Sequence, residues 1–318
     1  MFRVPTFSIV AASILAAVVL SAAQEPVFRS SSDVVRVFTT VTDKDGRLVT
    51  TLTKEAFEVR DEGKPQPIAL FDNTPQPVRL IEMLDVSGSM TGNLMLLRAA
   101  SDALFARLRP DDVARVGSFG REVVIGPEFT KNIEELRRAV PRSIDPDAPT
   151  PLWRAIDTAM DAFNDKSETS ARSVILVLSD GKDSGPITWT THVASQAEVI
   201  DRARKENVMI YAVAMRSRTG RPMPPVYGPR DMQALLAADR PDPGLARVAE
   251  ETGGGYIEIR LGEDLGSAFA SVADELHSQY LLGFAPPKRD GKTHEIEVRV
   301  SVRGVKPRAR KSYVAPKQ

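Results

Sequence analysis

The sequence predicts an α/β fold with a doubly wound, mostly parallel sheet and a smaller antiparallel β unit. Apolar runs alternate with segments of helical periodicity through the middle of the chain, as in successive βα units around a parallel sheet. Strand patterns of period two lie on both sides of this region. The chain has 318 residues, 42% of them hydrophobic, which is enough for a large domain and a smaller companion.

Composition excludes several classes of protein. Lys and Arg number 42 and Asp and Glu also number 42, so the formal net charge is zero and no basic excess attracts nucleic acid. The chain has no cysteine, which excludes disulfide staples and a lipid anchor on a cysteine. We therefore expect a fold stabilised by packing alone and no nucleic-acid partner.

Residues 1–23 are typical of an export signal. Arg3 precedes an apolar run from 7 to 20, and small residues suited to signal-peptidase cleavage end at Ala23. The run is shorter than the ~20 apolar residues that span a bilayer, so we expect cleavage, with an uncleaved membrane anchor as the alternative. The mature protein is then exported, periplasmic or secreted, and has no stable membrane span.

Residues 24–78 are expected to form an N-terminal β segment. A stretch rich in β-branched and aromatic residues at 34–41 precedes the turn signal at 43–46, and strands are expected on both sides of that turn. Further strands are expected at 57–60 and 68–71. A β segment of this size buries too little apolar surface to be stable alone. It therefore needs a partner surface.

Residues 79–279 are expected to form the main, Rossmann-like domain. Its expected strands are 80–84, 112–119, 123–125, 174–178, 208–214 and 256–259. Its expected helices are 94–108, 133–140, 152–163, 193–206, 245–251 and 264–277. The unbroken apolar runs are typical of parallel strands that are covered by helices on both faces. A proline-rich connection, 216–243, is long enough to suggest a functional or mobile loop.

Residues 280–318 return to strand patterns, at 280–284, 295–302 and 310–314. Because β segments precede and follow the main domain, we expect one antiparallel β unit built from both ends of the chain, with the main domain inserted. From residue 286 onward, ten Lys or Arg face three Asp or Glu. This basic tail is interpreted as a solvated strand face, with binding to a charged cell-surface polymer as the alternative.

The candidate site begins directly after the first strand of the main domain, at Asp85-Val86-Ser87-Gly88-Ser89. This is the carboxyl edge of the sheet, where open α/β folds bind ligands. One carboxylate and two hydroxyls, at i, i+2 and i+4, turn hard oxygens toward one point if the loop is tight, and Gly88 eases the turn. Mg²⁺ prefers such oxygens. Simple turn and N-cap chemistry is an alternative explanation for the same residues.

Two more loops are expected at this edge. Asp180 follows the strand 174–178, and Thr150 directly precedes the helix expected from 152. Trp189 and His192 also lie near this edge and are candidate partner-binding residues, because aromatic anchors beside a metal would give specificity.

These residues resemble the von Willebrand factor A (VWFA) domain with a metal-ion-dependent adhesion site (MIDAS). The D-x-S-x-S motif is matched by Asp85, Ser87 and Ser89, the loop threonine by Thr150 and the later aspartate by Asp180. The resemblance implies Mg²⁺, or Mn²⁺, bound directly by both serines, with Asp85 close by and Thr150 and Asp180 bound directly or through water. It also implies a protein partner that presents Asp, Glu or a terminal carboxylate to the metal.

The loop that carries Thr150 differs from the family's usual pattern. The family commonly has glycines before the threonine, whereas Thr150 lies between Pro149 and Pro151. A stiffer loop follows from the two prolines, because each fixes its own φ.

The resemblance covers about 79–279, and the flanks resemble an exported bacterial subgroup through the V-T-D-x-x-G-x-x-V stretch at 41–49 and Tyr-Leu-Leu-Gly-Phe at 280–284. It implies a cell-adhesion type of protein-binding module and no enzyme.

One alternative function is a structural component of an exported assembly with a non-essential metal site. Another is a metal-dependent hydrolase, which would need a general base beside the metal. The three histidines are poor candidates for that base, because they have no metal-ligand or triad spacing. A dehalogenase-type phosphatase would also need a carboxylate where Ser87 stands.

Overall fold

The computed structural model describes residues 34–164, 171–185, 194–215, 228, 241–260 and 263–317. The expected signal segment, most of the proline-rich connection, Trp189 and His192 lie outside these residues. Residues Val34–Gln318 form one unit by their contacts. In the part of the chain that is described, every helix is too short or too polar to cross a lipid bilayer.

A six-stranded sheet forms the centre of the main domain, in the strand order β10-β9-β8-β5-β6-β7. Neighbouring strands are parallel, except that β7 runs antiparallel to β6. The strands are β5 (Val78–Asp85), β6 (Val113–Phe119), β7 (Val123–Ile125), β8 (Arg172–Ser179), β9 (Met209–Met215) and β10 (Tyr256–Ile259). Every residue of β5 and of β9 is buried, because helices cover both faces of the sheet. The predicted α/β class is confirmed.

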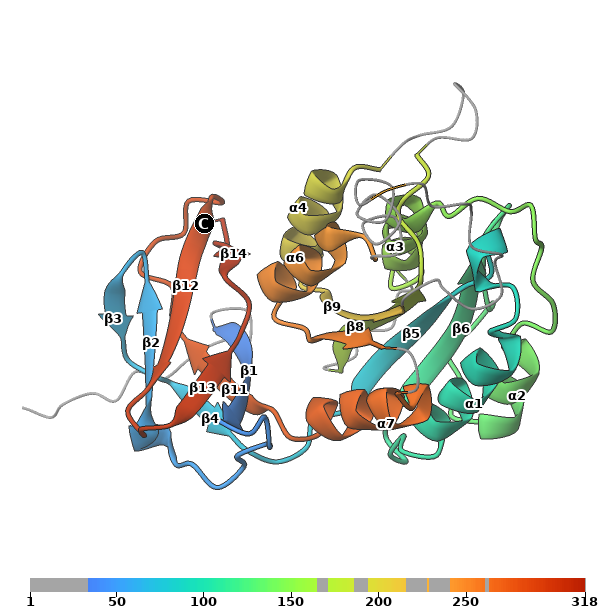
Figure 1. Ribbon diagram of the computed structural model, residues 1–318. Helices are drawn as coiled ribbons and strands as arrows, with labels where there is room; N and C mark the ends of the chain where they lie inside the picture. Colours follow the sequence, from blue (N-terminus) through green and yellow to red (C-terminus); the bar gives the residue numbers. More distant parts are fainter. Residues whose placement is uncertain are drawn as a thin grey trace, which may run out of the picture. The chain divides into compact units, whose positions relative to one another are not determined.

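The helices form two layers, one on each face of this sheet (Figure 1). One core cluster contains side chains of α1, α2 and α7, and the other contains side chains of α3, α4 and α6. The bounds are α1 (Leu94–Phe105), α2 (Ile133–Ala139), α3 (Leu152–Asp161), α4 (Gln196–Glu206), α6 (Pro243–Thr252) and α7 (Leu265–Leu276). Side-chain caps begin four of them, at Asn132, Ser195, Asp242 and Asp264, as polar residues with free oxygen acceptors commonly do.

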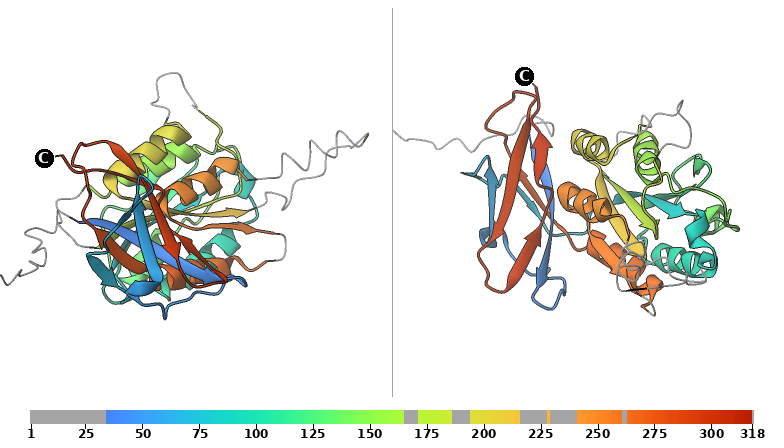
Figure 2. Two further views of the ribbon diagram at one scale, coloured as in Figure 1. Left: turned by 90° about the vertical axis from the view of Figure 1, so that its left-hand side faces the viewer. Right: turned by 45° about the horizontal axis from the view of Figure 1, so that its top comes forward.

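The two ends of the chain form an antiparallel β unit of two four-stranded sheets, ordered β13-β1-β11-β4 and β14-β12-β2-β3. N-terminal strands are β1 (Val35–Asp43), β2 (Phe57–Asp61), β3 (Lys64–Gln66) and β4 (Leu70–Asp72). C-terminal strands are β11 (Tyr280–Phe284), β12 (Thr293–Val300), β13 (Val305–Arg308) and β14 (Ser312–Val314). Figure 2 shows blue N-terminal strands beside red C-terminal ones, and β1 pairs with β11 while β12 pairs with β2. The predicted β unit from both ends of the chain is therefore confirmed.

Several details of the β unit differ from the sequence prediction, and one is that no strand was expected where β3 lies. Strand β13 was not predicted, because Pro307 within it donates no backbone hydrogen bond and interrupts the strand pattern. Its place at the edge of its sheet explains why proline is tolerated there. After the turn at Gly46, whose φ is +80°, the chain makes only an isolated bridge between Thr42 and Leu48 rather than a second regular strand.

Candidate functional site

Asp85 and Asp180 follow neighbouring strands at the point where the sheet reverses its order. From β5 the chain continues to β6 on one side, and it later returns to β8 on the other side of β5. Asp85 is the last residue of β5, and Asp180 directly follows the last residue of β8. Such a switch point opens a crevice beyond the carboxyl ends of the two strands, where open α/β sheets bind ligands.

The two serines and Asp180 form a continuous chain of oxygen atoms. The hydroxyl oxygens of Ser87 and Ser89 lie 3.0 Å apart, and Ser89 Oγ donates to Asp180 Oδ1 at 2.6 Å. Ser89 lies in a 3-10 turn, η3 (Gly88–Met90), which directs the loop back over the strand ends. Side chains of two separate loops, 91 positions apart, therefore meet at this edge.

Thr150 reaches the same point beside Gly181. A Cβ placed on Gly181 would lie 3.2 Å from Thr150 Oγ1 and 3.5 Å from Ser89 Oγ, so both hydroxyls border this glycine. The backbone N–H of Thr150 donates to Ser184 Oγ at 2.9 Å, and its carbonyl accepts from the Ser184 N–H at 3.0 Å. These two bonds fix the threonine loop against the Asp180 loop, although prolines flank Thr150.

Asp85 is fully buried behind the hydroxyls. Its Oδ2 accepts from Ser179 Oγ at 2.5 Å, and its Oδ1 accepts from the Ser87 N–H at 2.9 Å. Burial raises the pKa of Asp85 to about 6, against the lowering effect of these hydrogen bonds. The carboxylate thus holds the start of the serine loop, and this part of the arrangement is turn chemistry.

N-cap chemistry does not account for the serines. Ser87 precedes η3 without a side-chain cap hydrogen bond, and α1 begins only at Leu94, after an Asn93 that also makes none. The Ser87 and Ser89 hydroxyls are instead directed at each other and at Asp180.

Gly88 is required by a close approach between two loops. A Cβ at this position would lie 2.1 Å from the carbonyl oxygen of Pro146, and the Gly88 N–H donates to the carbonyl of Ala148 at 3.0 Å. The φ angle of Gly88 is not positive, so the reason for glycine is space rather than the tight turn that the sequence suggested. The serine loop and the loop before Thr150 therefore pack backbone to backbone.

Ser179 was not singled out from the sequence. Its hydroxyl donates to buried Asp85 and accepts from the Gly181 N–H at 3.2 Å, so it joins the strand ends to both loops. The sequence feature that could have identified Ser179 is its position: it is a hydroxyl residue at the end of an otherwise apolar strand, next to a candidate metal ligand. Ser184 was missed because its role is to bind the backbone of Thr150, which no side-chain motif records.

The oxygen atoms fit a small, hard cation. Mg²⁺ binds oxygen at about 2.1 Å in octahedral geometry, so neighbouring ligand oxygens lie about 3.0 Å apart. The Ser87 and Ser89 hydroxyl oxygens have this separation. Ser87, Ser89, Thr150 and Asp180 would hold the ion, and Asp85 would hold the loop that carries the serines.

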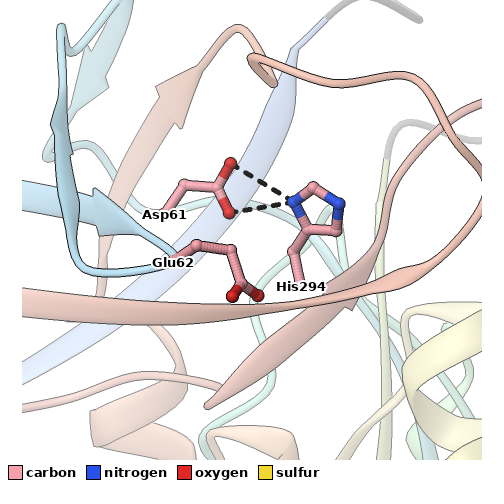
Figure 3. Close-up of side chains that lie close together, drawn as sticks. All are labelled: Asp61, Glu62 and His294. Atoms are coloured by element: carbon pink, nitrogen blue, oxygen red, sulfur yellow. Dashed lines mark hydrogen bonds and ion pairs between the residues drawn. The ribbon is translucent and has the colours of Figure 1, made fainter.

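A second group of metal-ligating side chains lies in the β unit. One ligand atom from each of Asp61, Glu62 and His294 lies within 4.8 Å of the others, and Figure 3 shows the Asp61 carboxylate facing the His294 ring. His294 Nδ1 lies 3.1 Å from Asp61 Oδ1, and His294 Nε2 lies 3.2 Å from Asp290 Oδ1. Glu62 Oε1 accepts from the Glu295 N–H at 2.7 Å. Both ring nitrogens thus have carboxylate partners, and we interpret this group as a structural ion-pair network.

Comparison with known proteins agrees with the fold. Residues 80–182 match the family model described as von Willebrand factor type A domain. No curated protein matches the sequence.

Several solved structures are similar to this chain. An aerotolerance-related membrane protein from Bacteroides fragilis NCTC 9343 shares 16% identity, with a TM-score of 0.45, over 63% of this chain and 98% of that one. A von Willebrand factor type A protein from Catenulispora acidiphila shares 12%, with a TM-score of 0.46, over 92% and 76%. Proximal thread matrix protein 1 from the mussel byssus, with a zinc-occupied MIDAS motif, shares 16%, with a TM-score of 0.47, over 69% and 50%.

The matched segment begins within β5 and ends at Lys182, within the loop that carries Asp180. It therefore includes every residue of the predicted metal site, namely Asp85, Ser87, Ser89, Thr150 and Asp180. The part of the chain that carries the site is thus similar to a von Willebrand factor type A domain.

Proposed function

We propose that this protein is an exported, metal-dependent protein-binding module of the adhesion type, and not an enzyme. The observation that carries the proposal is the contact between the Ser87 and Ser89 hydroxyls and the Asp180 carboxylate, with Thr150 beside them, at the switch point of the sheet. The apolar N-terminal run supports export.

Mg²⁺, or Mn²⁺, is the proposed ion. Two neutral serine hydroxyls and the Asp180 carboxylate leave a divalent ion short of negative charge, since buried Asp85 accepts hydrogen bonds from Ser179 and Ser87 instead. When bound, the ion supplies a positive charge that an incoming carboxylate neutralises. The proposed partner is accordingly a protein that presents Asp, Glu or a terminal carboxylate.

Helix polarity does not contribute to this proposal. Ser89 lies in the short turn η3, and the first long helix begins five positions later at Leu94, so the N–H groups of a helix end do not surround the serine. Attraction for the partner's carboxylate then depends on the metal, and removal of the metal should abolish capture.

A hydrolytic role has no support in the described histidines. His277 Nε2 lies 2.8 Å from Asp112 Oδ2, and His294 contacts Asp61, so each is paired away from the serine loop. Proton transfer at the metal would need a base within hydrogen-bond reach of the reacting group.

The test measures whether metal and carboxylate bind together. Mn²⁺ affinity of the full chain is measured with and without a short, C-terminally amidated peptide whose one carboxylate is an Asp side chain, and the matched amidated peptide carries Asn in its place. Because coupling between two ligands is reciprocal, the Asp peptide should raise Mn²⁺ affinity in the wild type and not in Ser89→Ala, and the Asn peptide should have no effect. Equal effects of the two peptides would contradict carboxylate capture.

A further inference from the structure

A pocket outside the metal site has a strongly basic lining. Four arginines line it: Arg36 of β1, Arg172 of β8, Arg204 of α4 and Arg310, which precedes β14. The only acidic side chain among the described lining residues is Glu251 of α6. Strands of the β unit and elements of the main domain therefore contribute positive charge to one space.

Strand alternation places Arg36 and Ser312 at this pocket. Val35 and Val37 belong to the core of the β unit, so Arg36 points to the opposite face of β1. Tyr313 also belongs to that core, and its neighbour Ser312 lines the pocket. Both side chains are thus directed away from the β core by the pleat of their strands.

Arg172 is 5% exposed, and its Nε–H group has no acceptor among the described residues. Its Nη1 donates to Gln279 Oε1, its Nη2 donates to the carbonyl of Leu276 at 2.8 Å, and its guanidinium lies 4.4 Å from the centre of the Phe38 ring. Its Nε is buried without a hydrogen-bond partner among the described residues. A buried donor without a partner costs free energy, so a negative charge close to this guanidinium would be stabilising.

Arg204 and Ser312 each also have a buried polar atom without a hydrogen-bond partner among the described residues. Arg204 Nη1 lies 3.1 Å from Asp201 Oδ1 and Nη2 lies 2.6 Å from Glu251 Oε2, so the one lining carboxylate is already paired. In the part of the chain that is described, Arg204 Nε and Ser312 Oγ are buried and have no hydrogen-bond partner. Ser312 is only 6% exposed.

Arg310 and Arg36 are the other two arginines that line the pocket. Arg310 Nη1 donates to Asn207 Oδ1 at 2.6 Å and Nη2 donates to the carbonyl of Arg36 at 2.7 Å, which leaves Nε buried without a partner among the described residues. The guanidinium of Arg36 makes no hydrogen bond or ion pair with any residue that the structure describes. Four guanidiniums thus share the pocket with one carboxylate.

Such an excess of charge is unfavourable without a counter-ion. Like charges repel more strongly where water is scarce, and burial lowers the pKa of Arg172 and of Arg310 to about 10. Glu275 and Asp112 favour the charged form of Arg172, and the Leu276 carbonyl at the C-terminal end of α7 accepts from it. None of these groups pairs with Arg36.

We propose that this pocket binds a small tetrahedral oxyanion of the phosphate class. Guanidinium groups donate in a planar fork that matches the oxygens of phosphate, and several arginines around one site are suited to a doubly charged anion. The Arg36 guanidinium provides donors that no described residue uses, and Arg172, Arg204 and Arg310 add positive charge from separate elements. The anion bridges the β unit and the main domain, so its binding stabilises the folded chain.

Arg36→Gln is the test variant, because the Arg36 side chain makes no hydrogen bond or ion pair with a described residue. Arg303→Gln is the matched control: Arg303 is exposed in the turn between β12 and β13, and it also makes no ion pair with a described residue. Inorganic phosphate is titrated calorimetrically into the full chain in EDTA, so that a metal at the sheet edge contributes nothing. Thermal unfolding is followed in phosphate and in NaCl of equal ionic strength.

The expected result is saturable binding of one phosphate per chain in the wild type and in Arg303→Gln, at least tenfold weaker in Arg36→Gln. The melting temperature should rise in phosphate and not in matched NaCl, since a ligand that binds only the folded state stabilises it. Glycerol phosphate distinguishes the sources: equal affinity indicates a phosphate ester, and loss of binding indicates the free ion. Absence of saturable binding up to ~10 mM, or equal affinity in Arg36→Gln, would overturn the proposal.

Discussion

The hydroxyl of Ser89 donates a hydrogen bond of 2.6 Å to the carboxylate of Asp180 across 91 positions of sequence. The first residue belongs to the loop after β5 and the second to the loop after β8, and these strands are neighbours at the switch point of the sheet. The contact brings a hydroxyl and a carboxylate together where the fold places its ligands. The proposed function depends on this relationship.

Replacement of Ser179 by alanine should destabilise the protein. The Ser179 hydroxyl donates to Asp85 Oδ2 at 2.5 Å, and Asp85 is fully buried, so the variant leaves a buried acceptor without its partner. We expect a loss of about 1–3 kcal/mol in the free energy of unfolding, measured with urea. Ser173→Ala, at a partly exposed position of the same strand, is the control and should change stability by less. Equal losses would show that the hydroxyl of Ser179 has no special role.

Replacement of Gly88 by alanine should separate the serine loop from the loop before Thr150. The new Cβ would lie 2.1 Å from the Pro146 carbonyl oxygen, which the backbone must move to avoid. We expect about 1–3 kcal/mol of destabilisation in urea unfolding together with weaker Mn²⁺ binding. The control is Gly126→Ala, because a Cβ there meets only the Val116 carbonyl at 3.4 Å, an ordinary contact. Unchanged metal binding in Gly88→Ala would contradict the packing argument.

Replacement of Glu82 by glutamine should change how stability depends on pH. Glu82 is fully buried in β5, and burial raises its pKa from 4.5 to about 8. Between these values the folded state keeps a proton that the unfolded state has lost, so wild-type stability falls as pH rises through this window and then levels off. Glutamine cannot ionise, so the gain of Glu82→Gln over wild type should grow from pH 5 to 8, by at most about 1.4 kcal/mol per unit. Urea unfolding at several pH values measures it, and a constant difference would refute the burial argument.

The sheet could be predicted from the sequence because its signals are local. Unbroken apolar runs indicated β5, β8 and β9, and the D-x-S-x-S segment follows β5 directly, so the chain order placed Asp85 and Asp180 at one edge. The pairing of the chain ends was predicted from the strand patterns that bracket the main domain. Strand β13 was hidden by Pro307, whose missing donor is tolerated only at a sheet edge.

Contacts between distant segments could not be predicted. Asp61 and His294 lie 233 positions apart, so no spacing rule relates them, and their contact depends on the pairing of β2 with β12. The basic pocket is lined by arginines from β1, β8, α4 and the segment before β14. Only the last of these belongs to the basic tail after residue 286 that the sequence showed. Trp189 and His192 stay predictions as partner-binding residues, since they lie outside the described residues.

Calorimetric titration of Mg²⁺ and of Mn²⁺ into the metal-stripped full chain tests the central claim most directly. Ser89→Ala removes a proposed ligand, and Ser271→Ala is its control, because the Ser271 hydroxyl donates within α7 to the Ser267 carbonyl at 2.8 Å. We predict one saturable site in the wild type and in Ser271→Ala, weakened at least tenfold in Ser89→Ala. No saturable binding in the wild type, or unchanged binding in Ser89→Ala, would contradict the metal site and favour a structural role in an exported assembly.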